Sequence, residues 1–235
     1  MASKKQTPAA ASSTAIPQAE AFFKKNKKAI IACVAVVVVL VGGFFAYKYL
    51  YQQPREEKAQ ALLAQGQALA AQQKYDEALK GEGKFPGFLK LISNYSGTDA
   101  ANVAKAQAGF CYAQQGKYKE AVAQLESFSP ASDNSLSPAA LGALANAYAG
   151  IGQIDKAVAT YEDAAERADN EILSPLFLVK AGELLETQKK YTEAVSLYKR
   201  VKENYPRCQY SVAQQQQDGS VGAAMIDVFI ERATR

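Results

Sequence analysis

The sequence predicts an all-α protein: one transmembrane helix near the N-terminus, then an α-solenoid of about four helical hairpins and a C-terminal capping helix. The first observation is a repeat. Similar segments surround Ala121, Ala157 and Ala194, which lie 36 and 37 positions apart. A period in the mid-thirties is typical of stacked helix–turn–helix units, which bury their apolar faces only against their neighbours. The second observation is an uncharged apolar segment, 29–47.

The first segment, 1–28, is expected to be a disordered cytoplasmic tail, because its start is rich in small and polar residues. It carries six lysines and one acid, Glu20. Lysine-rich flanks of a membrane helix stay in the cytoplasm, so the rest of the chain should lie on the other side. The same lysines could also contact anionic lipid headgroups. The remaining residues carry a net charge near zero, which argues against a nucleic-acid surface.

The segment 29–47 is expected to be a signal anchor in the lipid bilayer. Its 19 residues would span roughly 28 Å as a helix, close to the roughly 30 Å of a hydrocarbon core. Aromatic residues between Phe44 and Tyr51 would form a belt at the far interface. Cleavage after Gly42-Gly43 is conceivable, but bulky residues follow directly, so we expect an uncleaved anchor. The same two glycines could pack against another membrane helix, although one glycine pair favours a lipid-facing position.

A short linker, 48–58, should lead into the repeat domain, 59–206. Gly66, Tyr75 and Ala78 follow the order of the later units, so a fourth unit should come first. The step from Ala78 to Ala121 is longer than the others, because the insertion 81–87 contains three glycines and a proline that cannot continue a helix. The insertion is either a loop without a function of its own or a loop at the edge of the binding groove that contacts a partner.

Equivalent positions in the repeats carry residues of similar size and polarity. Four places after each anchoring alanine stands a large apolar residue: Leu125, Tyr161 and Tyr198. Upstream stand the small residues Gly109, Ala145 and Gly182, which allow two helices to approach closely. With these positions the chain resembles the tetratricopeptide repeat family over about 59–206. Pro206 matches the closing proline of that family, and the leading tryptophan is missing.

The C-terminal part should consist of a flexible tether, 207–222, and a capping helix, 223–235. The tether contains a run of four glutamines and Gly219. Helical periodicity resumes through Met225, Ile226, Phe229 and Ile230. The last unit of a repeat array needs a cover for its apolar face, and this helix is the natural one. The alternative is a helix that docks elsewhere.

The sequence predicts neither catalysis nor a cofactor or metal site. It has no histidine, the commonest general base and metal ligand. Among its three cysteines, Cys33 falls in the membrane segment, and Cys111 and Cys208 should lie too far apart for a disulfide. Asp163, Glu166 and Asp169 share a helix face, and we interpret them as a solvated acidic surface rather than a metal site.

The family resemblance implies that the first helix of each hairpin lines a concave partner-binding groove. Transferred to this sequence, its residues are Phe110, Gln114, Asn146, Gly150, Val179, Lys180, Glu183 and Glu186. Asn146 matches an asparagine with which chaperone-binding members hold a peptide carboxylate. Gly142 replaces the lysine expected one turn earlier, so capture of a peptide carboxylate is doubtful.

The whole arrangement resembles the YfgM-type ancillary subunit of the bacterial Sec translocon. That resemblance implies a non-catalytic scaffold in the inner membrane with a periplasmic repeat domain. Its protein partners would be translocon subunits, emerging secretory chains or periplasmic chaperones. The alternatives are an envelope adaptor for outer-membrane assembly or a secretion machine, a mitochondrial import receptor, which the lysine bias disfavours, and an unrecognised hydrolase.

Overall fold

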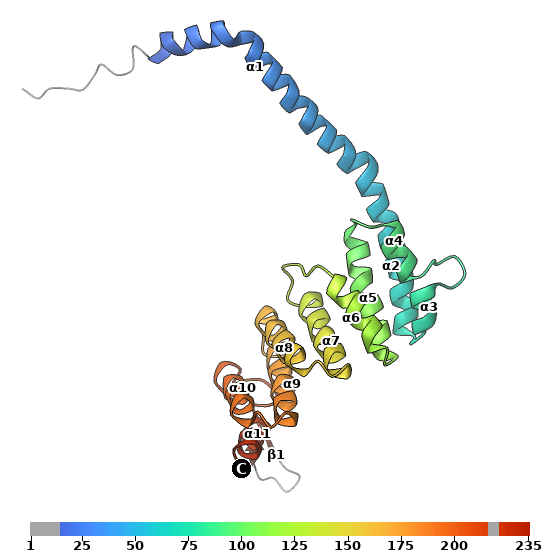
Figure 1. Cartoon of the computed structure of the whole chain (residues 1–235), viewed down its shortest axis with the longest axis vertical. Coiled ribbons are helices and arrows are strands. Elements are labelled where there is room, and N and C mark those ends of the chain that lie inside the picture. Colours follow the sequence, from blue (N-terminus) through green and yellow to red (C-terminus); the bar gives the residue numbers. More distant parts are fainter. Residues whose placement is uncertain (1–14, 216–220) are drawn as a thin grey trace, which may run out of the picture. The chain divides into compact units, whose positions relative to one another are not determined.

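The computed structural model describes residues 15–215 and 221–235, and its contacts divide the chain into two units, Met1–Pro54 and Arg55–Arg235 (Figure 1). The first unit holds α1 (Ala15–Ala46) and the π-helical segment η1 (Tyr47–Gln52). The second holds nearly all of α2 (Gln53–Ala71), and then α3 (Tyr75–Lys80), α4 (Phe88–Asn94), α5 (Asp99–Gln114), α6 (Tyr118–Ser127), α7 (Leu136–Gly150), α8 (Ile154–Ala168), α9 (Leu173–Thr187), α10 (Tyr191–Asn204), β1 (Ala213–Gln215), β2 (Val221–Ala224) and α11 (Met225–Thr234).

One helix among the described residues, Lys25–Ala71, contains a stretch apolar enough to cross a membrane, with a mean hydropathy of 2.9 over its best window. None of that window is buried by the rest of the chain. The helix therefore has the length and composition of a single span near the N-terminus. Residues 1–14 of the expected tail lie outside the described residues, and the tail's last part, from Ala15, already belongs to α1.

The linker expected at 48–58 is helical, since η1 and α2 cover it. Pro54 does not interrupt the helix, because it closely follows the π-helical segment η1, where the hydrogen bonds to the carbonyl four residues earlier, which proline would break, are already replaced. Glu56 on α2 accepts hydrogen bonds from the backbone N–H groups of Asp99 (2.7 Å) and Ala100 (3.0 Å) at the start of α5. From Arg55 onward, the expected linker is thus part of the first hairpin unit.

The insertion 81–87 returns to the core of the first hairpin unit. The side chain of Phe85 is buried and packs edge-on against Phe88, with the ring centroids 5.8 Å apart. A Cβ at Gly66 of α2 would lie 2.3 Å from the Phe88 ring, so only glycine allows α2 to pack there. Residues 82–84 at the tip are exposed. Whether this tip contacts a partner stays a prediction.

The predicted solenoid of helical hairpins is confirmed. Figure 1 shows α5 to α10 as helix pairs that follow one another along the second unit. In every hairpin turn, a backbone N–H bonds the carbonyl five residues earlier at 2.9–3.0 Å: Lys74 to Leu69, Lys117 to Tyr112, Gln153 to Tyr148 and Lys190 to Leu185. The residue before each donor has a positive φ: Gln73, Gly116, Gly152 and Lys189. Four turns of one geometry identify four units of one kind.

Small residues allow the two helices of a hairpin to approach closely. A Cβ at Gly109 would lie 2.4 Å from Cγ of Leu125, and one at Gly182 would lie 2.4 Å from Cε1 of Tyr198. Ala145, the equivalent residue of the third unit, lies in the same buried cluster as Tyr161. The expected pairing of small and large residues is therefore present in these three hairpins.

Two buried serines close the junctions between hairpins. Ser137 and Ser174 are fully buried in equivalent Leu-Ser-Pro segments at the starts of α7 and α9. The Ser174 hydroxyl donates to the carbonyl of Ala165 (2.7 Å) and accepts from the N–H of Asn170 (3.0 Å). The Ser137 hydroxyl donates to Asp133 (2.5 Å) and accepts from the N–H of Ala131 (2.9 Å).

Ser174→Ala is expected to lower the free energy of unfolding by about 1–3 kcal/mol, because it leaves the partly buried N–H of Asn170 without its partner and removes one of the donors to the carbonyl of Ala165. Chemical unfolding of the full chain in detergent, followed by circular dichroism, measures this change. Ser196→Ala, at an exposed position of α10, is the matched control and should be close to neutral. Equal stability of the two variants would contradict a structural role for Ser174.

The helix α11 covers the last hairpin. Phe229 packs against Tyr198 of α10, with ring centroids 5.5 Å apart, much as Phe177 of α9 packs against Tyr161 of α8 at 6.1 Å. Ile226 is fully buried, and its N–H bonds the carbonyl of Tyr210 (2.9 Å). The helix α11 therefore stands where the first helix of a further hairpin would pack, as expected of a cap.

The expected tether, 207–222, is only partly irregular. Cys208 is buried, and Tyr210 lies near Phe229, with ring centroids 6.4 Å apart. Ala213–Gln215 pairs antiparallel with Val221–Ala224. These contacts hold the segment against the last hairpin. The polar composition of the segment did not indicate such packing. The tether's residues 216–220 lie outside the described part of the chain.

Candidate functional site

Among the partly or fully exposed residues of the first helix of each hairpin, one set recurs on the same helix face as a stripe. On α5, α7 and α9 the stripe follows the spacing i, i+4, i+7, i+11, which selects one face of a helix. We call this surface the first-helix face. By the same repeat positions it continues on α2, and none of its members is buried. It consists of Gln60, Ala64, Gln67 and Ala71 on α2, Val103, Gln107, Phe110 and Gln114 on α5, Ala139, Ala143, Asn146 and Gly150 on α7, and Leu176, Lys180, Glu183 and Thr187 on α9.

Six of the residues expected to line the groove lie on this face: Phe110, Gln114, Asn146, Gly150, Lys180 and Glu183. The family pattern placed them by analogy, and the helical spacing places them on one side of their helices. Their contact with a partner stays a prediction. Sequence reasoning missed the apolar and small members at the starts of the stripes, such as Val103 and Leu176. Their signal was helical spacing from positions already assigned, because Val103 lies seven residues before Phe110 and Leu176 lies four residues before Lys180.

Val179 and Glu186 were expected on this face, and the structure places them elsewhere. Val179 is buried in the core of the last two hairpins, with 3 % of its surface exposed. It stands next to the exposed Lys180, and one step along a helix turns a side chain by about 100°. Glu186 is directed toward α10 and α11, where it accepts hydrogen bonds from Tyr198 (2.5 Å) and Arg232 (2.6 and 2.9 Å).

Asn146 is held by the second helix of its own hairpin. The buried Tyr161 hydroxyl donates to Oδ1 of Asn146 at 2.6 Å. Burial, with a smaller contribution from the charge of Glu183, raises the pKa of Tyr161 well above its usual value, so the hydroxyl keeps its proton. Because Oδ1 accepts this bond, the amide Nδ2 is turned away from Tyr161. Asn146 thus presents a hydrogen-bond donor on an exposed residue.

Two glycines of α7 are required for packing. A Cβ at Gly150 would lie 2.4 Å from the ring of Tyr118 in the preceding hairpin. A Cβ at Gly142 would lie 2.4 Å from the ring of Phe177 in the following one. The structure therefore explains why glycine stands at position 142. A long side chain at this position would displace Phe177.

Glu186 connects α9 to the capping helix. Burial alone would raise its pKa, but the hydrogen bonds from Arg232 and Tyr198 outweigh burial and hold the pKa below its ordinary value. A lowered carboxyl pKa means that the carboxylate stabilises the fold above its unfolded-state pKa. That stabilisation is lost as the pH falls through the pKa of the folded state.

Glu186→Gln is expected to lower the free energy of unfolding by about 1–2 kcal/mol at about pH 7. The difference from the wild type should shrink as the pH falls below the ordinary carboxyl range, because the wild type then loses the same charge. Denaturant unfolding at several pH values measures it. Glu231→Gln, which removes an exposed ion pair with Arg235 on α11, should have little effect. A pH-independent difference at Glu186 would contradict this account.

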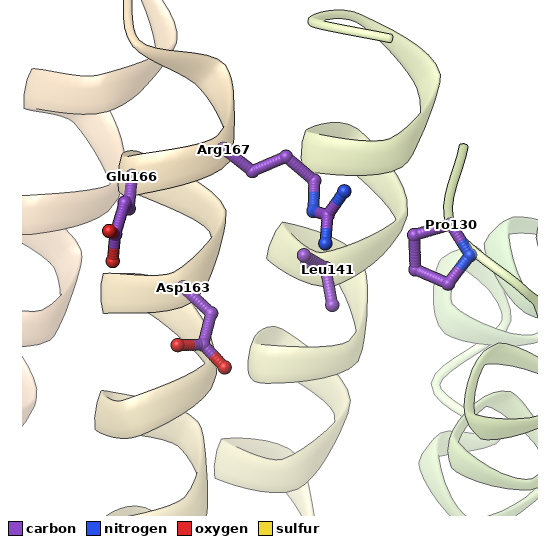
Figure 2. A pocket seen from close by; sticks show the side chains of 5 residues that line it. All are labelled: Pro130, Leu141, Asp163, Glu166 and Arg167. Atoms are coloured by element: carbon purple, nitrogen blue, oxygen red, sulfur yellow. The ribbon is translucent and has the colours of Figure 1, made fainter. Parts of the chain in front are cut away.

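An open cavity of about 480 Å³ lies beside α7 and α8, away from the first-helix face. Figure 2 shows its lining, with the guanidinium of Arg167 reaching from α8 toward Pro130 and with Asp163 and Glu166 along α8. Arg167 donates to the carbonyl of Ala131 at 3.2 Å. The acidic residues are exposed, and within the described ranges no three potential metal ligands cluster. The cavity's polar groups are those of a solvated surface.

The cysteines of the second unit are structural. Cys111 and Cys208 are buried and unpaired, and burial raises the pKa of the Cys111 thiol to about 11. A thiol of such a pKa is a poor nucleophile at neutral pH. In the first unit, a Cβ at Gly42 or Gly43 would meet nothing within 4 Å. Packing of these glycines against another helix stays a prediction.

Comparison with known families agrees with the architecture. The family model described as a tetratricopeptide repeat-like domain matches residues 20–219. The match includes the apolar segment and all four hairpins, and it ends before α11. A comparison with curated proteins found no match. Because the matched region covers most of the chain, the protein belongs to the tetratricopeptide repeat-like family.

Proposed function

We propose that the protein is a non-catalytic scaffold, anchored by α1 in the bacterial inner membrane, that binds other proteins on its first-helix face. The observation that carries the proposal is the stripe of partly or fully exposed residues that recurs at equivalent positions on α2, α5, α7 and α9. Domains of this family generally mediate protein–protein interactions. Repeat stacks of this kind use the extended surface of their aligned helices for binding.

The cellular role proposed is that of an ancillary subunit of the Sec translocon. In this role the repeat domain contacts emerging secretory chains or periplasmic chaperones. The six lysines before the apolar segment support a cytoplasmic N-terminus and a periplasmic repeat domain. The length and hydropathy of the apolar helix support a single-pass anchor.

Photo-crosslinking in intact cells tests this role. A photoreactive amino acid replaces Phe110, Asn146 or Glu183, and mass spectrometry identifies the adducts. Lys199, which is exposed on α10, is the control position on a second helix. Adducts with translocon subunits, secretory chains or periplasmic chaperones would support the proposal. Adducts only with outer-membrane assembly or secretion factors would support an envelope adaptor. Adducts at Lys199 alone would exclude the first-helix face as the binding surface.

The orientation is tested separately with a membrane-impermeant thiol reagent. Ser12→Cys places a thiol in the lysine-rich tail, and Lys84→Cys places one at the exposed tip of the insertion. In cells with a permeable outer membrane, we expect labelling of Cys at position 84 and protection at position 12. The reverse pattern would place the repeat domain in the cytoplasm.

A further inference from the structure

One side of α2 is exposed at positions that the later hairpins bury. It consists of Lys58, Ala61, Gln65 and Ala68, and we call it the end face of α2. The equivalent residues by repeat position are Ala101, Ala104, Ala108 and Cys111 on α5, Ser137, Ala140, Leu144 and Ala147 on α7, and Ser174, Phe177, Ala181 and Leu184 on α9. Leu184 is half-buried, and all the other equivalents are buried. The array of hairpins therefore begins with an uncovered helix side.

In the later units this side packs on the preceding hairpin. Phe177 of α9, for example, packs on Tyr161 of α8, with ring centroids 6.1 Å apart. Among the described residues, no hairpin precedes α2. The end face of α2 thus occupies a helix-packing position of the repeat without a helix of this chain against it.

The end face has the spacing of a seam between two helices. Its four residues follow one another by three, four and three positions, which is the spacing of the a and d positions of a coiled coil. Ala61 and Ala68 carry small side chains, so a second helix can approach closely. Gln65 lies between them and offers both a donor and an acceptor, so two Gln65 side chains can bond each other across a twofold axis.

The charges at the start of the end face are self-complementary. Glu57 and Lys58 are exposed neighbours, and neither takes part in an ion pair within the described ranges. In a twofold dimer every contact occurs twice, because residue i of one copy meets residue j of the other and the reverse. Glu57 of each copy then pairs with Lys58 of the other. This match favours a second copy of the chain as the partner.

The direction of the pair follows from the position of α2 in the chain. The helix Lys25–Ala71 contains both the apolar segment and α2. Two copies anchored in one bilayer send their chains out of the membrane on the same side, so their α2 helices start at the same level. A parallel pair of this kind places each end-face residue opposite its own counterpart.

We propose that the chain forms a parallel homodimer through the end face of α2. Ala61 and Ala68 form the close contact, and Gln65 pairs with its own counterpart. Glu57 of each copy pairs with Lys58 of the other. The dimer goes beyond the proposed scaffold function, and only its parallel direction rests on the proposed membrane anchor.

Cysteine crosslinking of the full chain in membranes tests the inference. Ala61→Cys and Ala68→Cys are made one at a time in a Cys33→Ser background, because Cys33 is exposed and the other two cysteines are buried. After mild oxidation we expect a disulfide-linked dimer at both positions. Gln67→Cys, on the first-helix face of α2, is the control and should stay monomeric. An antiparallel pair would crosslink a residue with itself only at its centre, so dimers at both positions identify the parallel direction.

Matched charge variants test the contact in the purified full chain. Gln65→Glu places two carboxylates opposite each other and should raise the dissociation constant of the dimer about tenfold. Gln67→Glu makes the same change on the first-helix face and should leave that constant unchanged. Glu57→Lys should weaken the dimer, and the further change Lys58→Glu should restore it, because the ion pairs are then reversed. Light scattering in detergent over a concentration series measures the dimer, and all four residues are exposed, so the fold should be unaffected.

Several results would overturn the inference. Equal crosslinking at position 67 and at the two end-face positions would show random collision. No dimer at either end-face position, or adducts there only with another protein, would exclude a second copy as the partner. Equal dissociation constants for Gln65→Glu and Gln67→Glu would place the contact elsewhere. Photo-crosslinks from Phe110 to other proteins do not depend on the dimer, so the scaffold role and the dimer fail separately.

Discussion

Tyr198→Ala is expected to lower the free energy of unfolding by about 3–5 kcal/mol, which is the usual cost of truncating a buried aromatic residue. Tyr198 is fully buried and joins three elements. Its ring packs on Gly182 of α9 and on Phe229 of α11, and its hydroxyl donates to Glu186. Alanine would therefore leave a cavity and loosen both the last hairpin and the capping helix.

Thermal unfolding of the full chain in detergent, followed by circular dichroism, measures the effect. The midpoint should fall by about 10 °C for the alanine variant. Tyr198→Phe keeps the ring and should cost only about 1–2 kcal/mol. Tyr191→Ala is the control of the same chemistry, because Tyr191 begins α10 with 46 % of its surface exposed. Similar losses at Tyr191 and Tyr198 would contradict the packing described.

Two arginines in the apolar segment are expected to release the protein from the membrane. Val37 and Leu40 lie near the middle of the segment and are exposed on α1. Each Val37→Arg or Leu40→Arg change should cost about 2.5–3.5 kcal/mol of insertion free energy, because a charged group must leave water. Together they should shift most of the protein out of the bilayer.

Extraction of cell membranes with alkaline carbonate measures this shift. The wild type and the apolar control, Val37→Leu with Leu40→Val, should stay with the membrane pellet. The double arginine variant should appear in the supernatant or be degraded. Retention of the double variant in the pellet, at wild-type amount, would show that α1 is not the anchor.

The repeat period could be predicted from the sequence because each stacked unit needs small and large residues at the same positions. Small residues such as Gly109 and Gly182 stand where two helices of a hairpin meet, and a large residue stands opposite each. The turns were readable where glycine takes a positive φ, at Gly116 and Gly152. They were less obvious where Gln73 and Lys189 adopt the same backbone, because these residues carry no signal for it.

The face assignment was less certain than the helix assignment. Lys180 and Glu183 lie on the exposed face as the family pattern implies, whereas the neighbouring Val179 is buried. An alignment to a repeat consensus can be shifted by one position without an obvious mismatch. In a helix such a shift turns the side chain by about 100°, so an exposed position can be mistaken for a buried one. Glu186 could not be assigned from sequence, because Arg232, which binds it, is 46 positions further along the chain.

The sequence by itself determined the all-α class, the period of the hairpins, the apolar segment and the capping helix. These features follow from local composition and periodicity, which each segment carries independently of its neighbours. Only the tertiary structure decided that Gly142 accommodates Phe177, that Tyr161 fixes the donor of Asn146, and that Phe85 and Tyr210 pack back onto the core. These contacts join residues far apart in the chain, and they depend on how helices pack, which no local pattern encodes.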